Sequence, residues 1–144
     1  MDKAAMAQHF KGATNGIKLE SFIFDVFPAA KTMAVLEIDR AAEFSPVKNA
    51  PGSAEDSPDT ARAMLGALHR AWLLAAGAEV EGAGVVEVSA AVSYAGEGLG
   101  AVAGQRLRAP LLLLRAGEAA ALKRQPAEGV AVYEIAEDGA LNAL

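Results

Sequence analysis

Apolar residues recur with two different periods along the chain, and the change of period separates predicted helices from predicted strands. Between residues 18 and 30 they fall three and four positions apart, at Leu19, Phe22, Ile23, Val26, Phe27 and Ala30. This spacing predicts an amphipathic helix, which Pro28 ends because proline has no backbone N–H. Residues 33–38 are mostly apolar and predict a buried strand. A helix, a short turn and a strand are typical of an α/β layer.

The strongest local signals predict a second helix over residues 58–76. Residues 41–57 precede it as a loop, because they contain prolines and glycine without periodicity. Ser57 can cap the helix, Pro58 suits its first position, and Gly77 can end it. The predicted buried stripe, which leaves His69 on the polar side, consists of Ala61, Met64, Leu65, Leu68, Ala71, Trp72 and Ala75.

Beyond Gly77 the pattern is typical of short strands separated by glycines. Strands are predicted over residues 85–94, 106–114 and 130–135, with a turn-rich break over residues 96–104. The expected fold class is therefore α+β: an α/β fragment, then a helix, then a small β-rich C-terminal unit. The corresponding parts are residues 1–56, 57–77 and 78–144.

Composition excludes several classes of protein. The 144 residues, 53% of them hydrophobic, suffice for a domain core. A net charge of −5 argues against nucleic-acid binding, although it leaves local phosphate binding open. The absence of cysteine excludes disulfides and thiolate chemistry. Neither a signal peptide nor a membrane-spanning run is found, so we expect a cytoplasmic protein without membrane contact.

Two lysines are candidates for phosphate binding. Lys18 opens the first predicted helix, where free backbone N–H groups also attract anions. Lys48 follows Pro46, which stiffens the loop leading to it. A solvated surface lysine is the alternative for each. Phe22 and Phe24 are two positions apart, so on a helix they face different ways. Core packing explains Phe22, whereas Phe24 lies off the stripe and can either pack in the core or line a pocket.

Three further features are better explained by structure than by chemistry. Arg62 is a candidate for tethering the loop that carries Lys48, although a helix-surface arginine is the commoner outcome. His69 is expected to form a hydrogen bond at the surface or between domains, since further metal ligands are not found around it in the sequence. Residues 93–99 have the composition of a strand that ends in a turn.

Several exact strings in the chain are shared with one enzyme family. They are Lys18-Leu-Glu-Ser-Phe-Ile-Phe-Asp25, Glu43-Phe-Ser-Pro-Val-Lys-Asn49, Thr60-Ala-Arg62, His69, Trp72-Leu73 and Ser93-Tyr-Ala-Gly-Glu-Gly-Leu99. In this order they resemble the C-terminal part of the UDP-N-acetylhexosamine pyrophosphorylases, the uridylyltransferases that make UDP-N-acetylglucosamine. The resemblance runs from about residue 15 to residue 114.

The resemblance implies a fold and a site. Residues 1–56 would be the end of a Rossmann-like nucleotidyltransferase layer. Lys18 would contact the phosphates of UTP and Lys48 those of the sugar nucleotide, both as catalytic and substrate-binding residues, with Phe22 and Phe24 near the bound UDP-sugar. The implied substrates are UTP and an N-acetylhexosamine 1-phosphate. The implied cofactor is Mg²⁺, with its ligands expected outside this chain.

The chain departs from the family in one respect. The family's glycine-rich nucleotide loop, roughly Leu-x-x-Gly-x-Gly-Thr-x-Met-Gly, has no counterpart in this sequence. We therefore expect the missing N-terminal catalytic region to be a partner. Three interpretations stay open: part of such a pyrophosphorylase, a related nucleotidyltransferase for another UDP-sugar, or a binding module that kept the fold and lost catalysis.

Overall fold

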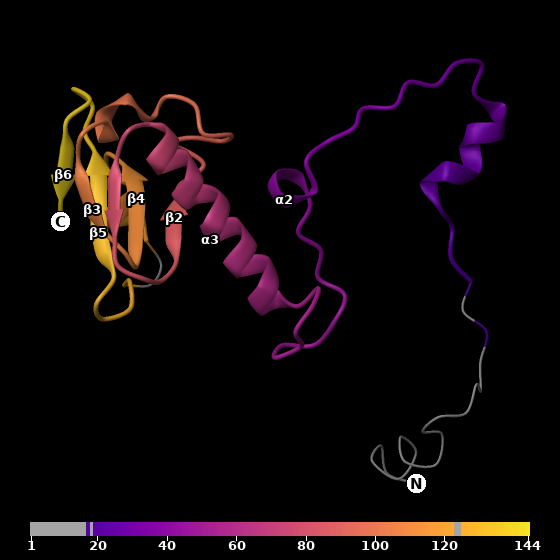
Figure 1. Cartoon of the computed structure of the whole chain (residues 1–144), viewed down its shortest axis with the longest axis horizontal. Helices are drawn as coiled ribbons and strands as arrows, with labels where there is room; N and C mark the ends of the chain where they lie inside the picture. Colours follow the sequence, from indigo (N-terminus) through magenta and orange to yellow (C-terminus); the bar gives the residue numbers. More distant parts are fainter. Residues whose placement is uncertain (1–16, 18, 123–124) are drawn as a thin grey trace, which may run out of the picture. The chain divides into compact units, whose positions relative to one another are not determined.

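The structure is a computed structural model that describes residue 17 and residues 19–122 and 125–144. It divides into two units, Met1–Glu37 and Ile38–Leu144, which are treated separately below (Figure 1). The described residues contain short helices and two small sheets, so the expected mixed α/β character is confirmed. The predicted division at residues 57 and 78 stays a prediction.

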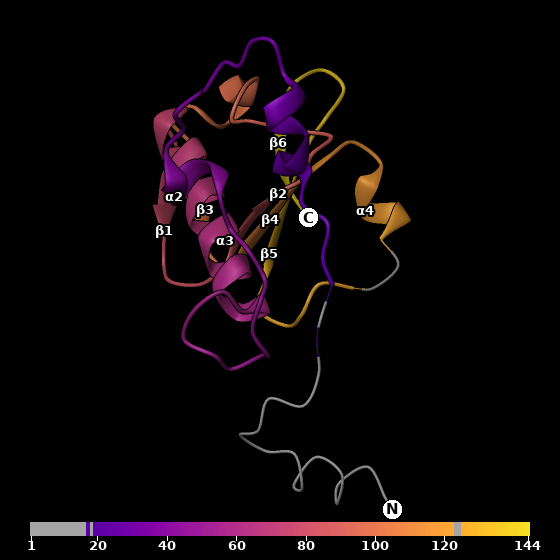
Figure 2. The same ribbon diagram turned by 90° about the vertical axis from the view of Figure 1, so that its right-hand side faces the viewer.

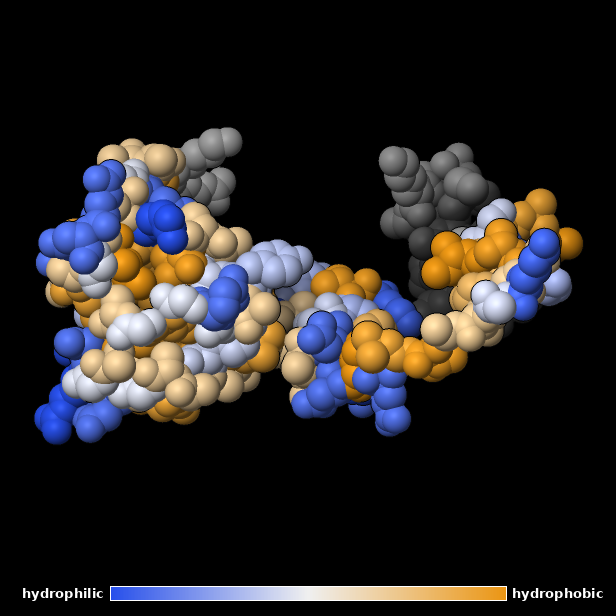
Figure 3. Space-filling model, turned by 90° about the horizontal axis from the view of Figure 1, so that it is seen from above, coloured by the Kyte–Doolittle hydropathy of each residue, from blue (hydrophilic) through white to orange (hydrophobic). Residues whose placement is uncertain are grey.

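The first unit forms a shorter helix than the sequence predicts. Its described residues form the 3₁₀ helix η1 (Ile23–Ala29), and Pro28 lies inside this helix rather than at its end. The apolar stripe of the predicted helix is solvent-exposed, with Leu19 92% and Ile23 83% accessible, and hydrophobic side chains at the surface of this unit are visible in Figure 3. Short helices owe most of their stability to packing of an apolar face. That packing is missing among the described residues of this unit, so the prediction of an amphipathic helix over residues 18–30 was wrong.

The strand predicted over residues 33–38 is also wrong. These residues have no regular secondary structure, and Val35 and Leu36 are exposed. A strand is stabilised by hydrogen bonds to a neighbouring strand and by cover on its apolar faces. Neither is present among the described residues of the first unit, so the apolar run alone does not produce a strand.

Two helices begin the second unit. α2 (Arg40–Glu43) is a single turn capped by Asp39, whose side chain accepts a hydrogen bond from the Ala41 N–H. α3 (Pro58–Ala75) agrees closely with the predicted helix. The Ser57 hydroxyl accepts the Thr60 N–H at 3.2 Å, and the Thr60 hydroxyl accepts the Ser57 N–H at 2.9 Å. Ser57 is fully buried. This reciprocal cap confirms the helix start read from the sequence.

The buried face of α3 differs from the predicted stripe. Gly66, His69 and Leu73 are its buried residues, while Leu65 is 50% exposed. Gly66 permits this contact, because a Cβ there would lie 3.3 Å from Val85 and 3.5 Å from the Val86 carbonyl oxygen. The placement of His69 on a polar face was therefore wrong. The sequence pattern does not reveal this face because a glycine and a histidine lie at its centre.

Six short strands follow α3 in the described part of the chain, and all their pairings except the last are parallel. β1 (Glu79–Glu81) pairs with β3 (Arg106–Arg108), and β2 (Val86–Val88) pairs with β4 (Leu111–Arg115). β4 also pairs in parallel with β5 (Ala131–Ile135), which pairs with the antiparallel β6 (Leu141–Ala143). The segment β1–β2 thus pairs strand by strand with the segment β3–β4 that follows it in the chain (Figure 2).

The strands are shorter and more numerous than predicted. Only three residues of the stretch 85–94 form a strand, and residues 106–114 form two strands separated by Ala109 and Pro110. The break over residues 96–104 contains the 3₁₀ helix η2 (Leu99–Val102), and α4 (Glu118–Ala121) follows β4. The core between α3 and the two sheets is built from side chains that are almost fully buried: Leu73, Val86, Val102, Leu107, Leu111 and Leu113.

Helix α3 covers the outer edges of the first two strands. The Val88 N–H donates to Nδ1 of His69 at 3.2 Å, and the guanidinium of Arg70 donates to the carbonyl oxygens of Val80, at 3.2 Å, and Gly82, at 3.0 Å. Val80 and Val88 lie at positions whose backbone groups point away from the neighbouring strands. The helix therefore satisfies edge groups that would otherwise be open to another chain.

Candidate functional site

Lys48 lies in a loop that is folded back onto the start of α3. Its backbone N–H donates to the Asp56 carbonyl oxygen at 2.6 Å, and the N–H of Asn49 donates to the same oxygen at 2.8 Å. The Asn49 side chain donates to the Glu55 carbonyl oxygen at 2.8 Å. These three bonds join the two arms of the loop, so the backbone at Lys48 is fixed by its own segment rather than by distant elements.

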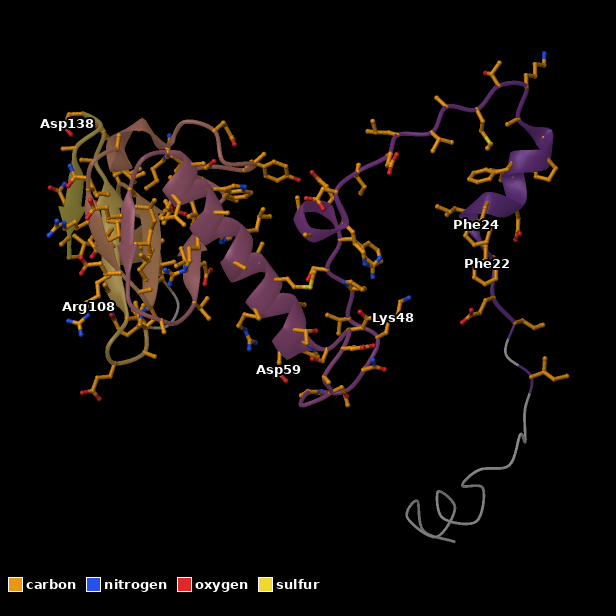
Figure 4. The ribbon with its side chains drawn as sticks, in the orientation of Figure 1. Phe22, Phe24, Lys48, Asp59, Arg108 and Asp138 are labelled. Carbon is orange, nitrogen blue, oxygen red and sulfur yellow. The ribbon has the colours of Figure 1, made fainter. Side chains whose placement is uncertain are left out.

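The side chain of Lys48 is exposed, and it forms no ion pair or hydrogen bond with any described residue. In Figure 4 it extends from the loop away from α3. The ammonium group is therefore available to an anion, at a position that the loop backbone fixes. The other predicted cation, Lys18, lies outside the described residues, so its role stays a prediction.

Phe22 and Phe24 belong to the first unit, and they face one another. Their ring centroids are 5.0 Å apart with an interplanar angle of 12°, and Phe24 also meets Phe27 edge-on at 6.3 Å (Figure 4). The prediction that they face different ways was wrong, because Phe22 is extended and precedes the 3₁₀ helix. Both rings remain about half exposed, at 48% and 53%. The structure brings the two phenylalanines together, and it does not place them relative to Lys48.

Arg62 does not reach the Lys48 loop directly. Its guanidinium lies 3.8 Å from Oδ1 of Asp59, and Oδ2 of Asp59 accepts the Gly52 N–H at 2.7 Å. The tether predicted for Arg62 is therefore made by Asp59, which lies in the first turn of α3 (Figure 4). The sequence offered one signal for this role, since an acidic residue in a first helical turn is well placed to accept backbone N–H groups.

Residues 93–97 form a tight turn around a carboxylate that sequence reasoning treated only as structural. Glu97 accepts the N–H groups of Tyr94, at 2.9 Å, and Ala95, at 2.6 Å, and the Ser93 hydroxyl at 3.0 Å. Hydrogen bonds from Tyr94 and Ala95 hold the pKa of Glu97 at about 2, well below its usual value. Gly96 is required here, because a Cβ would lie 2.9 Å from the Trp72 indole. The turn is thereby locked against α3.

A hollow of about 850 Å³ lies between α3, β2, β4 and this turn. Its walls include the His69 and Trp72 rings, whose centroids are 4.8 Å apart, and its polar groups include Ser89 bonded to Glu118 at 2.8 Å. Burial lowers the pKa of His69. Ala42 and Glu43 line this hollow, whereas Lys48 and the rest of the segment 45–57 do not.

Among the described residues, no group of three or more histidine, aspartate or glutamate side chains is arranged to hold an ion. The described residues therefore do not form a Mg²⁺ site by themselves. Within the same part of the chain, none of the helices has the length and apolar character needed to cross a membrane.

Several known proteins are similar in sequence to this chain. No protein-family model matches the chain. It is 53% identical over 87 residues to the UDP-N-acetylglucosamine pyrophosphorylase of Saccharomyces cerevisiae, covering 59% of this chain and 18% of that protein. It is 47% identical over 105 residues to UDP-N-acetylglucosamine diphosphorylase 1 of Arabidopsis thaliana, covering 69% and 21%. The human UDP-N-acetylhexosamine pyrophosphorylase-like protein 1 is 43% identical over 118 residues, covering 69% and 23%.

A solved structure agrees with these relatives. The crystal structure of a protein assigned as a UDP-N-acetylglucosamine pyrophosphorylase from Entamoeba histolytica superposes with a TM-score of 0.58 at 34% identity, covering 65% of this chain and 24% of that one. The chain thus spans about a fifth of the length of the curated relatives it matches. Over 59–69% of its own length it is homologous to the UDP-N-acetylglucosamine pyrophosphorylases, and the resemblance seen in its motifs is confirmed.

Proposed function

We propose that this chain supplies the part of a UDP-N-acetylglucosamine pyrophosphorylase active site that contains Lys48. The observation that carries the proposal is 53% identity to the yeast enzyme of that name, combined with a loop that fixes the Lys48 backbone and leaves its ammonium group free. The identity supports the reaction class. The loop geometry supports Lys48 as the residue of this chain that meets a phosphate.

The reaction joins two polyanions. A phosphate oxygen of N-acetylglucosamine 1-phosphate attacks the α-phosphorus of UTP, the bond from that phosphorus to the β-phosphate oxygen breaks, and pyrophosphate leaves with its electron pair. A phosphate monoester is already a charged nucleophile, so no general base is needed. Catalysis then consists of positioning and of neutralising charge, which a fixed lysine can do. In this proposal Lys48 holds the sugar-nucleotide phosphates and Lys18 those of UTP.

The rest of the active site lies in the part of the relatives that this chain does not match. The glycine-rich loop that holds the nucleotide and the Mg²⁺ ligands belong there on this proposal, and so does the recognition of uracil and of the sugar. The name of the human relative refers to N-acetylhexosamines in general. On this proposal, the choice between N-acetylglucosamine 1-phosphate and N-acetylgalactosamine 1-phosphate is made by that region and not by this chain.

A chimeric enzyme tests the proposal. The full chain replaces the homologous fifth of the Saccharomyces cerevisiae pyrophosphorylase, and pyrophosphate release is measured with UTP, the sugar 1-phosphate and Mg²⁺. We expect the chimera to be active and this chain alone to show negligible turnover, because it lacks a cradle of backbone N–H groups for the triphosphate. Turnover of about 1 per second or more by the chain alone would refute this division of the site.

Lys48→Ala in the chimera tests the residue itself. A charge-assisted hydrogen bond is worth about 1.5–3 kcal/mol, so kcat/KM should fall by at least about tenfold. Lys48→Arg should restore activity only in part, because a planar guanidinium does not reproduce a compact ammonium charge. The melting temperature should barely change, since the side chain is exposed. Unchanged activity per folded molecule in Lys48→Ala would remove Lys48 from the site.

A further inference from the structure

The backbone of Asp56 has an uncommon conformation in the loop that carries Lys48. Its φ of +47° is the only positive φ of a non-glycine residue in the described part of the chain. Left-handed backbone is disfavoured for residues with a Cβ, although aspartate tolerates it better than most. This conformation is accompanied by a carbonyl oxygen that accepts two N–H groups at once, those of Lys48 and Asn49, at 2.6 and 2.8 Å.

Asp59 fixes the far side of the same loop. Its Oδ2 accepts the Gly52 N–H at 2.7 Å, at the tip of the loop. Because Asp59 belongs to the first turn of α3, this bond ties the tip to a helix whose start is itself locked by the buried Ser57 and by Thr60. The loop is thus attached to α3 at two points. Asp59 holds its tip, and Ser57, the capping residue that follows Asp56, holds its base.

We propose that Asp56 and Asp59 are positioning residues for the uridylyl transfer, acting through Lys48. Asp56 holds the Lys48 backbone from its carbonyl oxygen, and Asp59 prevents the loop tip from swinging away from α3. Neither residue touches substrate in this proposal, which rests on the proposed function of Lys48. A lysine on an ordered loop loses less conformational freedom when it binds a phosphate than a lysine on a mobile one.

The charges around the loop support positioning over direct ligand binding. Glu55, Asp56 and Asp59 are all acidic, and a phosphate would be repelled by them unless it approached from the Lys48 side. One oxygen of Asp59 is used by the Gly52 N–H and the other faces Arg62, which reduces the effective charge of that carboxylate. The Asp59 carboxylate therefore holds the loop, and the free lysine is the group that faces outward.

The first test measures amide hydrogen exchange in the full chain. Asp56→Gly keeps access to left-handed backbone, whereas Asp56→Val does not. Asp59→Asn keeps an acceptor oxygen for Gly52, whereas Asp59→Ala removes it. We expect exchange at the amides of Lys48 and Asn49 to speed up at least about tenfold in the valine variant and to change little in Asp56→Gly. The Gly52 amide should exchange faster in Asp59→Ala and be rescued in Asp59→Asn. Equal exchange in all variants would overturn the inference.

The second test measures kcat/KM in the chimeric enzyme. Asp56→Val and Asp59→Ala should each lower it at least about fivefold, with Asp56→Gly and Asp59→Asn near the parent value. Combined with Lys48→Ala, Asp59→Ala should cause no further loss, because both act through the same ammonium group. Full additivity of the two losses overturns the positioning role. If Lys48→Ala alone has no effect, it is the proposed function of Lys48 that fails, and the exchange data still decide how the loop is held.

Discussion

Replacement of His69 by phenylalanine removes the hydrogen bond that joins α3 to the edge of β2. The imidazole is 7% exposed and Val88 is 4% exposed, and Nδ1 accepts the Val88 N–H at 3.2 Å. A phenylalanine ring has a similar size and keeps the contact with Trp72, where the centroids are 4.8 Å apart. The substitution therefore removes the acceptor and preserves most of the packing.

The expected loss of stability comes from the N–H group that is left behind. A buried donor without a partner costs about 1–3 kcal/mol, because water cannot replace the lost acceptor. The described edge of β2 offers the Val88 N–H no other acceptor. With a denaturant dependence of about 2 kcal/mol per M urea, the unfolding midpoint should fall by roughly 0.5–1.5 M.

The same bond makes stability depend on pH. Only neutral imidazole can accept at Nδ1, and burial lowers the pKa of His69 in the folded state, against opposing contributions from the Val86 backbone and Glu87. The unfolded chain therefore binds a proton more readily than the folded chain. The stabilisation is complete above the unfolded pKa of about 6.5 and declines as the pH falls through that value toward the lower folded pKa.

Urea titration followed by tryptophan fluorescence is the assay, since Trp72 is the single tryptophan and lies against His69. Titrations at pH 7.5 and pH 5.5 are compared in a His9→Gln background, which leaves His69 as the one histidine. The parent should lose stability at the lower pH, and most of that loss should disappear in His69→Phe. A midpoint unchanged by the substitution at pH 7.5, or a pH response of equal size in both proteins, would refute the role given to this bond.

Two further predictions concern the same unit. Glu97→Gln should speed amide exchange at Tyr94 and Ala95, with Glu87→Gln as the control, and equal exchange in both variants would contradict the assignment. In the parent, the turn should open as the pH falls from about 4.5 toward the Glu97 pKa of about 2, because protonation removes the charge of the acceptor. Val47, Leu65 and Val85 are exposed and line one hollow beside α3, so we expect self-association through this apolar patch. Leu65→Gln should then lower the weight-average mass at high concentration in sedimentation velocity, and a parent that stays monomeric at every concentration would contradict this.

Sequence reasoning succeeded where local chemistry decides the structure. The start of α3 follows from Ser57 and Pro58, and its end from Gly77, whose φ is +90°. These signals act within one helical turn, so they need no knowledge of the rest of the fold. The predicted strand over residues 130–135 also matches β5, because the run Ala131–Ile135 is bounded by turn residues on both sides.

The sequence predictions failed where contacts between residues distant in the chain determine the structure. The buried face of α3 is set by contact with β2, through Gly66 and His69, and neither residue has the hydrophobicity that marks a buried position. The helix expected near residue 22 has correct periodicity and nothing to pack against among the described residues of its unit. Periodicity therefore identified an apolar surface in both segments, and only tertiary contacts determine whether that surface becomes regular structure.

The contrast between Lys48 and the two phenylalanines determines what a catalytic partner has to provide. The Lys48 loop is ordered by bonds within residues 48–59, so its geometry comes with this chain. Phe22 and Phe24 contact each other and stay half exposed in a segment that has little regular structure. On the proposed function, the larger region of the relatives would supply the nucleotide loop and also bury residues 17–38, at a cost in ordering that segment. Binding of that region and capture of the UDP-sugar by the phenylalanines would then be coupled, whereas Lys48 needs no such ordering.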